Sequence, residues 1–443
     1  MEAVLLFVLG VVIFVIGLGV SIGLHELGHL SFAKLFGVKV TQYMIGFGKT
    51  LFSFRRGETE YGVKALPLGG YISMIGMFPP KHPGEHGRNA STGFYNQVVQ
   101  DARTASADTV ADGEEDRTFY RLAPWKRIII MFAGPFMNLV IAFVLIAIIV
   151  TGIGVQSSNT TIAAVSECVL PATSSRQTCD SSDPASPAAT AGIRPGDKLV
   201  SLDGKQITDW DQVSELIKSV PGQTVPLVVD RNGKQVTLHV TPVKSKQYVY
   251  DAQGKPKKDA SGSAITREVG VVGITPGTEL VHQPITAVMP ALGANIAAVA
   301  NIVIDLPQRM VAVWNAAFGS EKRAQDSPVG LVGVGRFAGD IASSDAIPII
   351  GKVQTMLSLL ASLNVALFVM NMIPLLPLDG GHIIGAIWEW IRRAFAKLFK
   401  RRDPGPVDMA KLMPITFVVI IVLGGMSLLL AYADIVKPVN LLG

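Results

Sequence analysis

Two histidines and a glutamate at a short, fixed spacing carry the most specific chemistry in this sequence. They form the motif His25-Glu26-Leu27-Gly28-His29. Residues four apart on a helix lie on one face, so both imidazoles can bind one zinc ion, with Glu26 beside the metal as a general base for its water. Placing such polar groups at the end of an apolar helix, in or near hydrocarbon, costs free energy. Their presence there favours a functional site. The alternative is a polar contact between helices or a place at the membrane interface.

A third ligand must come from elsewhere in the chain, because a hydrolytic zinc site usually takes three protein ligands and leaves the fourth position for water. The candidate is Asp379, in the stretch that runs from Asn371 to His382. His382 is a competing ligand, and Asp379 can also be read as a helix cap or turn residue before Gly380-Gly381. We predict a zinc site of His25, His29 and Asp379, with Glu26 as the catalytic residue.

The composition places this site in a membrane protein. Of the 443 residues, 49% are hydrophobic and only 16% are charged, which argues against an ordinary soluble enzyme. The net charge of +5 gives no reason to expect nucleic-acid binding, and we predict no nucleic-acid partner. Four apolar runs are long enough to cross a hydrocarbon core of about 30 Å. These runs are Ala3 to Leu24, Ile128 to Gly154, Val353 to Leu378 and Met413 to Ala433.

Basic residues orient these four spans, because cytoplasmic loops collect Lys and Arg. Lys126 and Arg127 precede the second span, and six basic residues lie between the third and the fourth: Arg392, Arg393, Lys397, Lys400, Arg401 and Arg402. Both connections are therefore predicted to be cytoplasmic, and the termini and the long middle region extracytoplasmic. His25, His29 and Asp379 then lie at the same, cytoplasmic depth.

The region between the first two spans has two different compositions. Residues 37–80 are rich in β-branched, aromatic and glycine residues, and predict β-hairpins lying against or dipping into the membrane. An extended substrate can pair with such a hairpin, and Gly46 and Gly48 are candidates for this contact. His82 to Asp116 is polar, which predicts a mobile cytoplasmic loop.

Two asparagines in the third span, Asn364 and Asn371, are candidates for holding the substrate backbone or an oxyanion. Hydrogen bonding between helices explains them equally well. Gly134-Pro135 and Asn138 in the second span are more readily explained by helix packing than by chemistry.

The middle region contains a small α+β module. Ala191 to Pro242 resembles a PDZ domain, a fold that holds an extended peptide or chain end. Lys244 to Arg267 is predicted to be a flexible insertion, and Ile296 to Phe318 an interfacial helix. Cys168 and Cys179 can form a disulfide if this region lies outside the cytosol.

The chain is therefore predicted to be a polytopic α-helical membrane protein with nine segments. They are 1–36, first transmembrane helix; 37–80, membrane-associated hairpins; 81–123, polar cytoplasmic loop; 124–155, second transmembrane helix; 156–245, extracytoplasmic PDZ-like domain with insertion; 246–345, flexible insertion and interfacial helix; 346–390, third transmembrane helix with the Leu-Asp-Gly motif; 391–411, basic cytoplasmic connection; and 412–443, fourth transmembrane helix and tail.

Together these features resemble the bacterial site-2 proteases, a family of intramembrane zinc metalloproteases. The likeness covers nearly the whole length and includes the motif at His25, the glycine-rich hairpins, Ala133 to Asn138, the PDZ-like module and the block from Asn371 to His382. It implies that His25, His29 and Asp379 bind zinc and that Glu26 is the base. It also implies a place in the bacterial cytoplasmic membrane, where single-span proteins already trimmed by another protease are cleaved. Family substrates include anti-sigma factors and remnant signal peptides.

Two other functions stay open on the sequence alone. The histidines could serve a membrane metal carrier or sensor, or the chain could be a scaffold built around the PDZ-like module with a degenerate metal site. The PDZ-like module could bind a chain end or act as a size filter.

Overall fold

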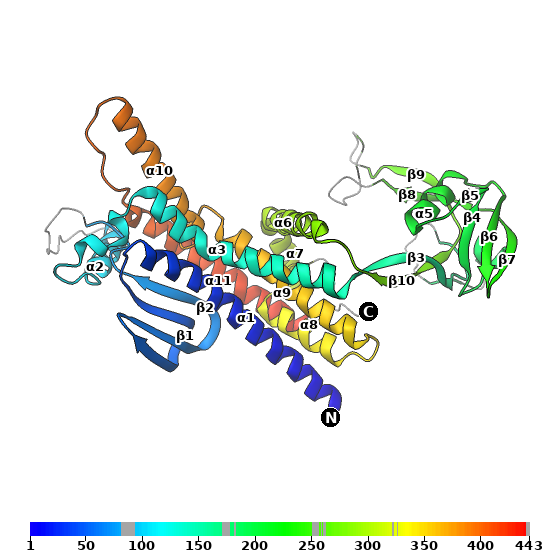
Figure 1. The fold of residues 1–443 in the computed structure, drawn as a ribbon, viewed down its shortest axis with the longest axis horizontal. Coiled ribbons are helices and arrows are strands. Elements are labelled where there is room, and N and C mark those ends of the chain that lie inside the picture. The colour runs from blue at the N-terminus through cyan, green and yellow to red at the C-terminus, as the bar shows by residue number, and fades with distance from the viewer. Residues whose placement is uncertain are drawn as a thin grey trace. The chain divides into compact units, whose positions relative to one another are not determined.

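The computed structural model divides the chain into two compact units. The helical unit comprises Met1–Ile153 and Pro284–Gly443, and the β unit comprises Gly154–Gln283. The structure describes residues 1–80, 94–170, 178–180, 183–249, 257, 259, 263–320, 323–325 and 327–439. Figure 1 shows helices dominating the first unit and strands the second.

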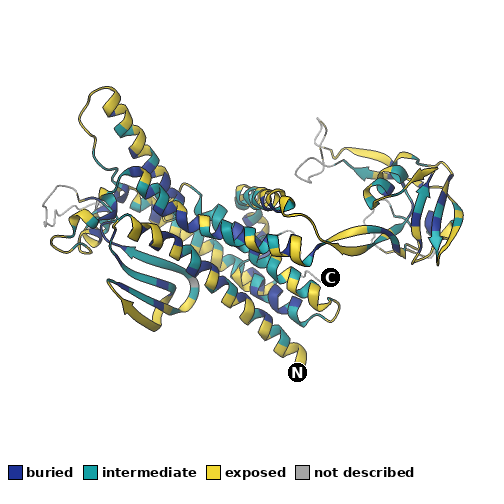
Figure 2. Cartoon of the chain, viewed as in Figure 1, coloured by how far each residue is buried: buried dark blue, intermediate teal, exposed yellow. Residues whose placement is uncertain are grey.

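Within the described residues, five helices are long and apolar enough to cross a membrane, one more than we predicted. The elements in these ranges are α1 (Glu2–Leu35), α3 (Pro124–Ala147) with the π-helix η3 (Ile148–Ile153), α6 (Val288–Ile304), α9 (Ile349–Asn371) and α11 (Met413–Val436). Many large apolar residues of these helices are exposed, and Figure 2 shows exposed and buried residues along the same helices. An outward apolar surface is what lipid contact requires.

The stretch from Ile296 to Phe318, which we predicted to be one interfacial helix, is not one continuous helix. The structure has two helices there, α6 and α7 (Leu306–Phe318), which meet at Asp305. Pro307 lies in the first turn of α7. Proline lacks the N–H that would continue a preceding helix but fits a first turn, so it separates the two.

The third apolar run also ends earlier than predicted. Helix α9 stops at Asn371, and α10 (Asp379–Leu398) begins after a connection containing Pro374 and Pro377. Asp379 therefore lies at the start of a separate helix rather than at the end of a span. Helix α10 also occupies the first part, up to Leu398, of the stretch we predicted to be a basic connection. The rest of that stretch leads to the short helix η5 (Met409–Leu412).

The helices that carry the site approach one another through glycines. A Cβ atom on Gly28 of α1 would lie 2.4 Å from the carbonyl oxygen of Ala133 in α3. Nearer the start of α1, Gly17 packs against Leu360 of α9, and Asn364 Nδ2 donates a hydrogen bond to Ser21 Oγ at 2.9 Å. The contacts of Gly17 and Ser21 make α1 parallel to α9, and the contacts of His25 with Asn138 and of His29 with Ile130 make α1 antiparallel to α3. The small helix α8 (Leu331–Ser343) also packs along α1.

The region after α1 contains two long strands, β1 (Val40–Arg56) and β2 (Thr59–Met74), which pair with each other. The strands bend, so that Gln42 to Ile45 have partners on both sides, among Glu60 to Val63 and among Gly70 to Ser73. Gly46 and Gly48 have φ values of 92° and 84°, which favour glycine, and they lie where β1 departs from regular pairing.

The stretch predicted to be a mobile loop contains regular structure. Helix α2 (Phe94–Ala107) lies in it, and the side chain of Arg103 pairs with Asp408 before η5. The prediction is therefore wrong for this part. Its polar composition belongs to a helix that packs on η5 and α11. His82 and its neighbours lie outside the described residues.

The β unit contains a six-stranded sheet, with β10, β3, β4, β6 and β7 in that order and β5 beside β4. The strands are β3 (Val155–Val165), β4 (Lys198–Leu202), β5 (Lys205–Gln206), β6 (Val225–Arg231), β7 (Lys234–Val240) and β10 (Ile274–Val281). Helices α4 (Pro187–Thr190) and α5 (Trp210–Ser219) contribute residues to its apolar core, which includes Leu199, Val213 and Val229. Cys168 and Cys179 form a disulfide.

The β unit is longer than the domain we predicted to end at residue 245. Strands β8 (Val243–Tyr248) and β9 (Thr266–Val271) pair with each other and form the two ends of the predicted flexible insertion. Most residues between these two strands lie outside the described part of the chain. Strand β10 then returns to pair with β3.

Candidate metal centre

His25 and His29 lie one turn apart near the end of α1, and their imidazoles converge. The Nε2 atoms are 3.2 Å from each other. His29 is buried and His25 half-buried, directly after the apolar part of α1 that runs from Ala3 to Leu24. The helical spacing of the motif therefore produces the predicted juxtaposition.

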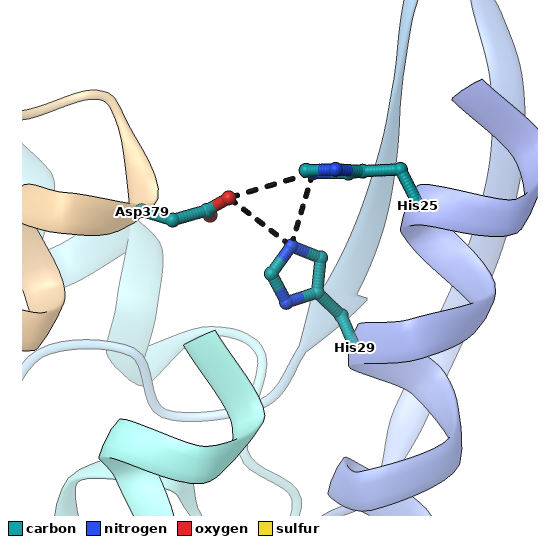
Figure 3. A group of neighbouring side chains, drawn as sticks. All are labelled: His25, His29 and Asp379. Carbon is teal, nitrogen blue, oxygen red and sulfur yellow. Dashed lines mark hydrogen bonds and ion pairs between the residues drawn. The ribbon is translucent and has the colours of Figure 1, made fainter. Parts of the chain in front are cut away.

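Asp379 meets both histidines from α10, as Figure 3 shows. Its Oδ2 atom lies 3.4 Å from His25 Nε2 and 3.3 Å from His29 Nε2. Gly380 and Gly381 allow this approach, because Cβ atoms there would lie 2.3 Å from the Ile373 carbonyl oxygen and 2.6 Å from the Leu376 nitrogen. The tight packing of the turn before α10 thus depends on the two glycines, and it holds Asp379 against α1.

The spacing of the three atoms fits a zinc ion. Ligands bound at about 2.0–2.1 Å in a tetrahedral arrangement lie about 3.3–3.4 Å apart, and the three distances here are 3.2, 3.3 and 3.4 Å. Asp379 Oδ2 is buried, and within the described chain it has no hydrogen-bond partner of proper geometry. A buried carboxylate oxygen without a donor is costly unless a cation faces it.

Helix α3 supplies a partner for the other nitrogen of each imidazole. His29 Nδ1 is 2.7 Å from the carbonyl oxygen of Ile130, and His25 Nδ1 is 3.1 Å from Asn138 Nδ2. Between them on the same helix face, Gly134 lies against His29, whose Nε2 would be 2.1 Å from a Cβ atom there. From the sequence, we had preferred helix packing to chemistry as the explanation of Gly134 and Asn138. Their spacing of four residues was visible in the sequence, but the helix they face was not.

Glu26 is buried on the same turn as His25 and is covered by β2. A Cβ atom on Gly70 would lie 2.9 Å from Glu26 Cγ and 2.8 Å from Ile22 Cγ2. Tyr43 of β1 donates a hydrogen bond from Oη to the carbonyl oxygen of Gly23 at 2.7 Å. Burial, with a contribution from the neighbouring Glu26 carboxylate, raises the pKa of Tyr43 to about 12, so the phenol stays a donor. The sheet thus lies directly against the helix turn that carries the motif.

The remaining predicted residues lie apart from this cluster. The ring of His382, the competing ligand, contacts Phe119 edge-on, with centroids 6.4 Å apart, and it is not in the group of convergent ligand atoms. Asn364 is fully buried and bonds to Ser21 and to the Leu360 carbonyl, contacts within and between helices. Asn371 is half-buried at the end of α9. Gly46 and Gly48 lie in β1, with Gly46 against the Leu66 carbonyl.

Comparison with known proteins gives a consistent result. Residues 13–402 match the model of "Peptidase family M50". "Zinc metalloprotease Rip1" of Mycobacterium tuberculosis is 33% identical over 440 residues, which cover 99% of this chain and 100% of the relative. The protein of the same name from Mycolicibacterium smegmatis is 32% identical over 453 residues, with the same coverage.

A more distant relative extends the match beyond these bacteria. "Metalloprotease MmpA" of Caulobacter vibrioides is 26% identical over 397 residues, covering 88% of this chain and 86% of the relative. The family match includes the motif at His25 and the turn that carries Asp379, and it spans most of the chain. The chain belongs to peptidase family M50, the site-2 protease family of membrane zinc metalloproteases.

Proposed function

We propose that this chain cleaves single-span membrane proteins within the bilayer, with a zinc ion held by His25, His29 and Asp379. The observation that carries the proposal is the convergence of these three ligand atoms beside Glu26 in apolar helices. The printed names of the relatives, zinc metalloproteases, support the same chemistry.

The residues divide the work of peptide hydrolysis. Bound zinc lowers the pKa of a coordinated water to about 7 and polarises a carbonyl. Glu26, one residue from His25, accepts the proton of the attacking water and passes it to the leaving nitrogen. Burial of the site keeps bulk water away from these charges and strengthens their interactions.

A helical substrate must unwind first, because its carbonyls are shielded by their own hydrogen bonds and unwound backbone in a membrane needs new partners. The sheet of β1 and β2 is suited to provide them, since β2 passes Glu26 at Gly70. We expect an extended substrate to pair with this sheet near Gly46 and Gly48, with Asn371 and Asn364 as further candidates for its backbone.

The helix directions support four membrane crossings rather than five. Helices α1 and α9 run parallel and both lead toward the cluster, whereas α3 runs away from it. The end of α3 and the start of α9 therefore lie on the same side of the membrane, so the chain between them crosses it an even number of times or not at all. If α6 crossed, α7 would have to return, yet its 13 residues span about 20 Å of a core about 30 Å thick. We therefore expect α6 and α7 to remain on one side.

The same reasoning gives an orientation in the bacterial cytoplasmic membrane. Basic residues favour the cytoplasmic side of the membrane for the end of the helices at which the three ligands lie. These basic residues are Lys126 and Arg127 at the start of α3 and those at the end of α10. The β unit and both termini are then extracytoplasmic. In that position the PDZ-like β unit can select substrates that another protease has trimmed, such as anti-sigma factors or remnant signal peptides.

The test is cleavage of a model single-span substrate by the purified protein in detergent. Wild type should cleave it, whereas Glu26→Gln should keep zinc and lose about 10²- to 10⁴-fold in rate, the usual contribution of a general base. A zinc chelator should also stop the reaction. Cleavage that persists in the Gln variant would contradict the role of Glu26 as the base, whereas a metal-transport activity that survives this substitution would favour the carrier over the protease. Absence of zinc from the wild type would favour the scaffold.

A further inference from the structure

Zinc ligation through Nε2 fixes the proton on the other nitrogen of each imidazole. A neutral histidine that gives its Nε2 lone pair to a metal carries hydrogen on Nδ1, and that N–H needs an acceptor. The two histidines of this site must therefore each find an acceptor behind the cluster. The inference below rests on the proposed zinc site.

The acceptor beside His29 fixes which ring nitrogen carries the proton. Its Nδ1 lies 2.7 Å from the Ile130 carbonyl oxygen, which can only accept. The proton is thus on Nδ1, and Nε2 is free for the metal.

The partner of His25 Nδ1 in the described chain is the side-chain amide of Asn138, at 3.1 Å. In the structure, the amide nitrogen faces the ring of His25, while Oδ1 is buried without a hydrogen-bond partner among the described residues. Asn138 as a whole is 0% exposed. The two ends of an amide are exchanged by a half-turn of the side chain, so their assignment follows the hydrogen-bond network. With Oδ1 toward His25, the amide provides the acceptor that the metal-binding tautomer requires.

We propose that Asn138 is a positioning residue whose side-chain oxygen accepts the Nδ1 proton of His25 and so directs Nε2 of that ring to the metal. One face of α3 then serves both ligands, with the Ile130 carbonyl for His29, Asn138 for His25, and Gly134 between them making room for the His29 ring. The second span thereby positions a metal site to which it contributes no ligand.

The test compares zinc affinity, by competition with a chelator, in full-length protein purified in detergent. Asn138→Leu keeps the size but removes the acceptor and should weaken zinc binding by about 10- to 100-fold, the usual cost of losing such a partner. Asn138→Asp keeps an acceptor oxygen and should bind zinc much as wild type does. Asn295→Leu is the matched control, because its amide bonds to Ser362 between α6 and α9 and touches no ligand.

Unchanged affinity in Asn138→Leu, or equal losses in the Leu and Asp variants, would overturn the assignment. If Asn138→Leu does not fold, NMR of the zinc-bound wild type with ¹⁵N-labelled histidine provides the test. His25 should carry a proton on Nδ1, and an unprotonated Nδ1 would contradict the proposal. Failure of the wild type itself to bind zinc would instead remove the proposed function, a result distinct from a difference among variants.

Discussion

Each unit of the chain buries a carboxylate, and the two have opposite surroundings. In the β unit, Asp197 is 1% exposed and receives three hydrogen bonds, two from the Arg231 guanidinium at 2.8 and 2.7 Å and one from the Arg194 backbone nitrogen at 2.8 Å. In the helical unit, Asp379 Oδ2 is buried with no such donor and faces two imidazole nitrogens. The satisfied carboxylate stabilises its fold, whereas a buried oxygen without a donor is costly unless a cation faces it, as we propose for Asp379.

The largest expected effect comes from exchanging the carboxylate of Asp379 for an amide. Asp379→Asn should abolish substrate cleavage and weaken zinc binding by more than about 100-fold, beyond the cost of losing an outer partner. The metal-free protein should be no less stable than metal-free wild type, because the buried oxygen it changes has no donor to lose. Zinc content and thermal unfolding of both proteins check this. Normal zinc content in the variant would remove Asp379 from the ligand set.

The close approach of α3 to His29 gives the next effect. Gly134→Ala inserts a methyl group where the imidazole lies, and overpacking of this kind costs about 1–3 kcal/mol, or about 5- to 150-fold in zinc affinity if the ring must move. Gly424→Ala is the control, because that helical glycine of α11 has open space around it. Equal zinc affinity in the two variants would show that the ring and α3 are less tightly packed than described.

The contact of β2 with Glu26 should have a smaller and more selective effect. Gly70→Ala places a methyl group 2.9 Å from Glu26 Cγ, so the carboxylate must shift. We expect turnover to fall about tenfold, the size of a loss of about 1.4 kcal/mol, with zinc content unchanged. A matching fall in zinc content would mean that β2 supports the metal site rather than the base.

The fourth change should have the smallest effect on the metal site, because it acts only on the stability of the β unit. The Arg231 guanidinium holds the pKa of Asp197 below its usual range, so the pair stabilises the fold above the ordinary carboxyl pKa of about 3.9 and loses this contribution as pH falls through the lowered value. Asp197→Asn should lower the free energy of unfolding by about 2 kcal/mol at neutral pH and reduce its acid dependence, with zinc affinity unchanged. Hydrogen exchange of β4 and β6 between pH 7 and pH 2 measures it. An unchanged acid dependence would mean that another group governs it.

The site could be predicted from sequence where the information is local or chemical. The spacing of His25 and His29 defines one helix face, and the need for a third ligand led to Asp379. The tertiary contacts around the site could not be predicted. Nothing in the periodicity of the second span says that Asn138 and Gly134 face the histidines, because an apolar helix in lipid has no single buried side.

The fold shows the same division. Apolar length located four of the five helices that are long enough to cross a membrane. The ends of helices depended on single residues, such as Pro307 at the start of α7 and the prolines between α9 and α10. Polar composition misled us over α2, where a helix held by tertiary contacts, such as that of Arg103 with Asp408, occupies part of a stretch predicted to be a loop. The length of the β unit depended on the return of β10 to β3, a pairing between segments more than a hundred residues apart.

The most direct test of the central claim is zinc-edge X-ray absorption on the purified full-length protein. We predict one zinc ion per chain, bound by two imidazole nitrogens and a carboxylate oxygen at about 2.0–2.1 Å, with the imidazole signal reduced in His29→Ala and the ion lost in Asp379→Asn. A protein without zinc, or an ion whose coordination is unchanged in both variants, would contradict the account.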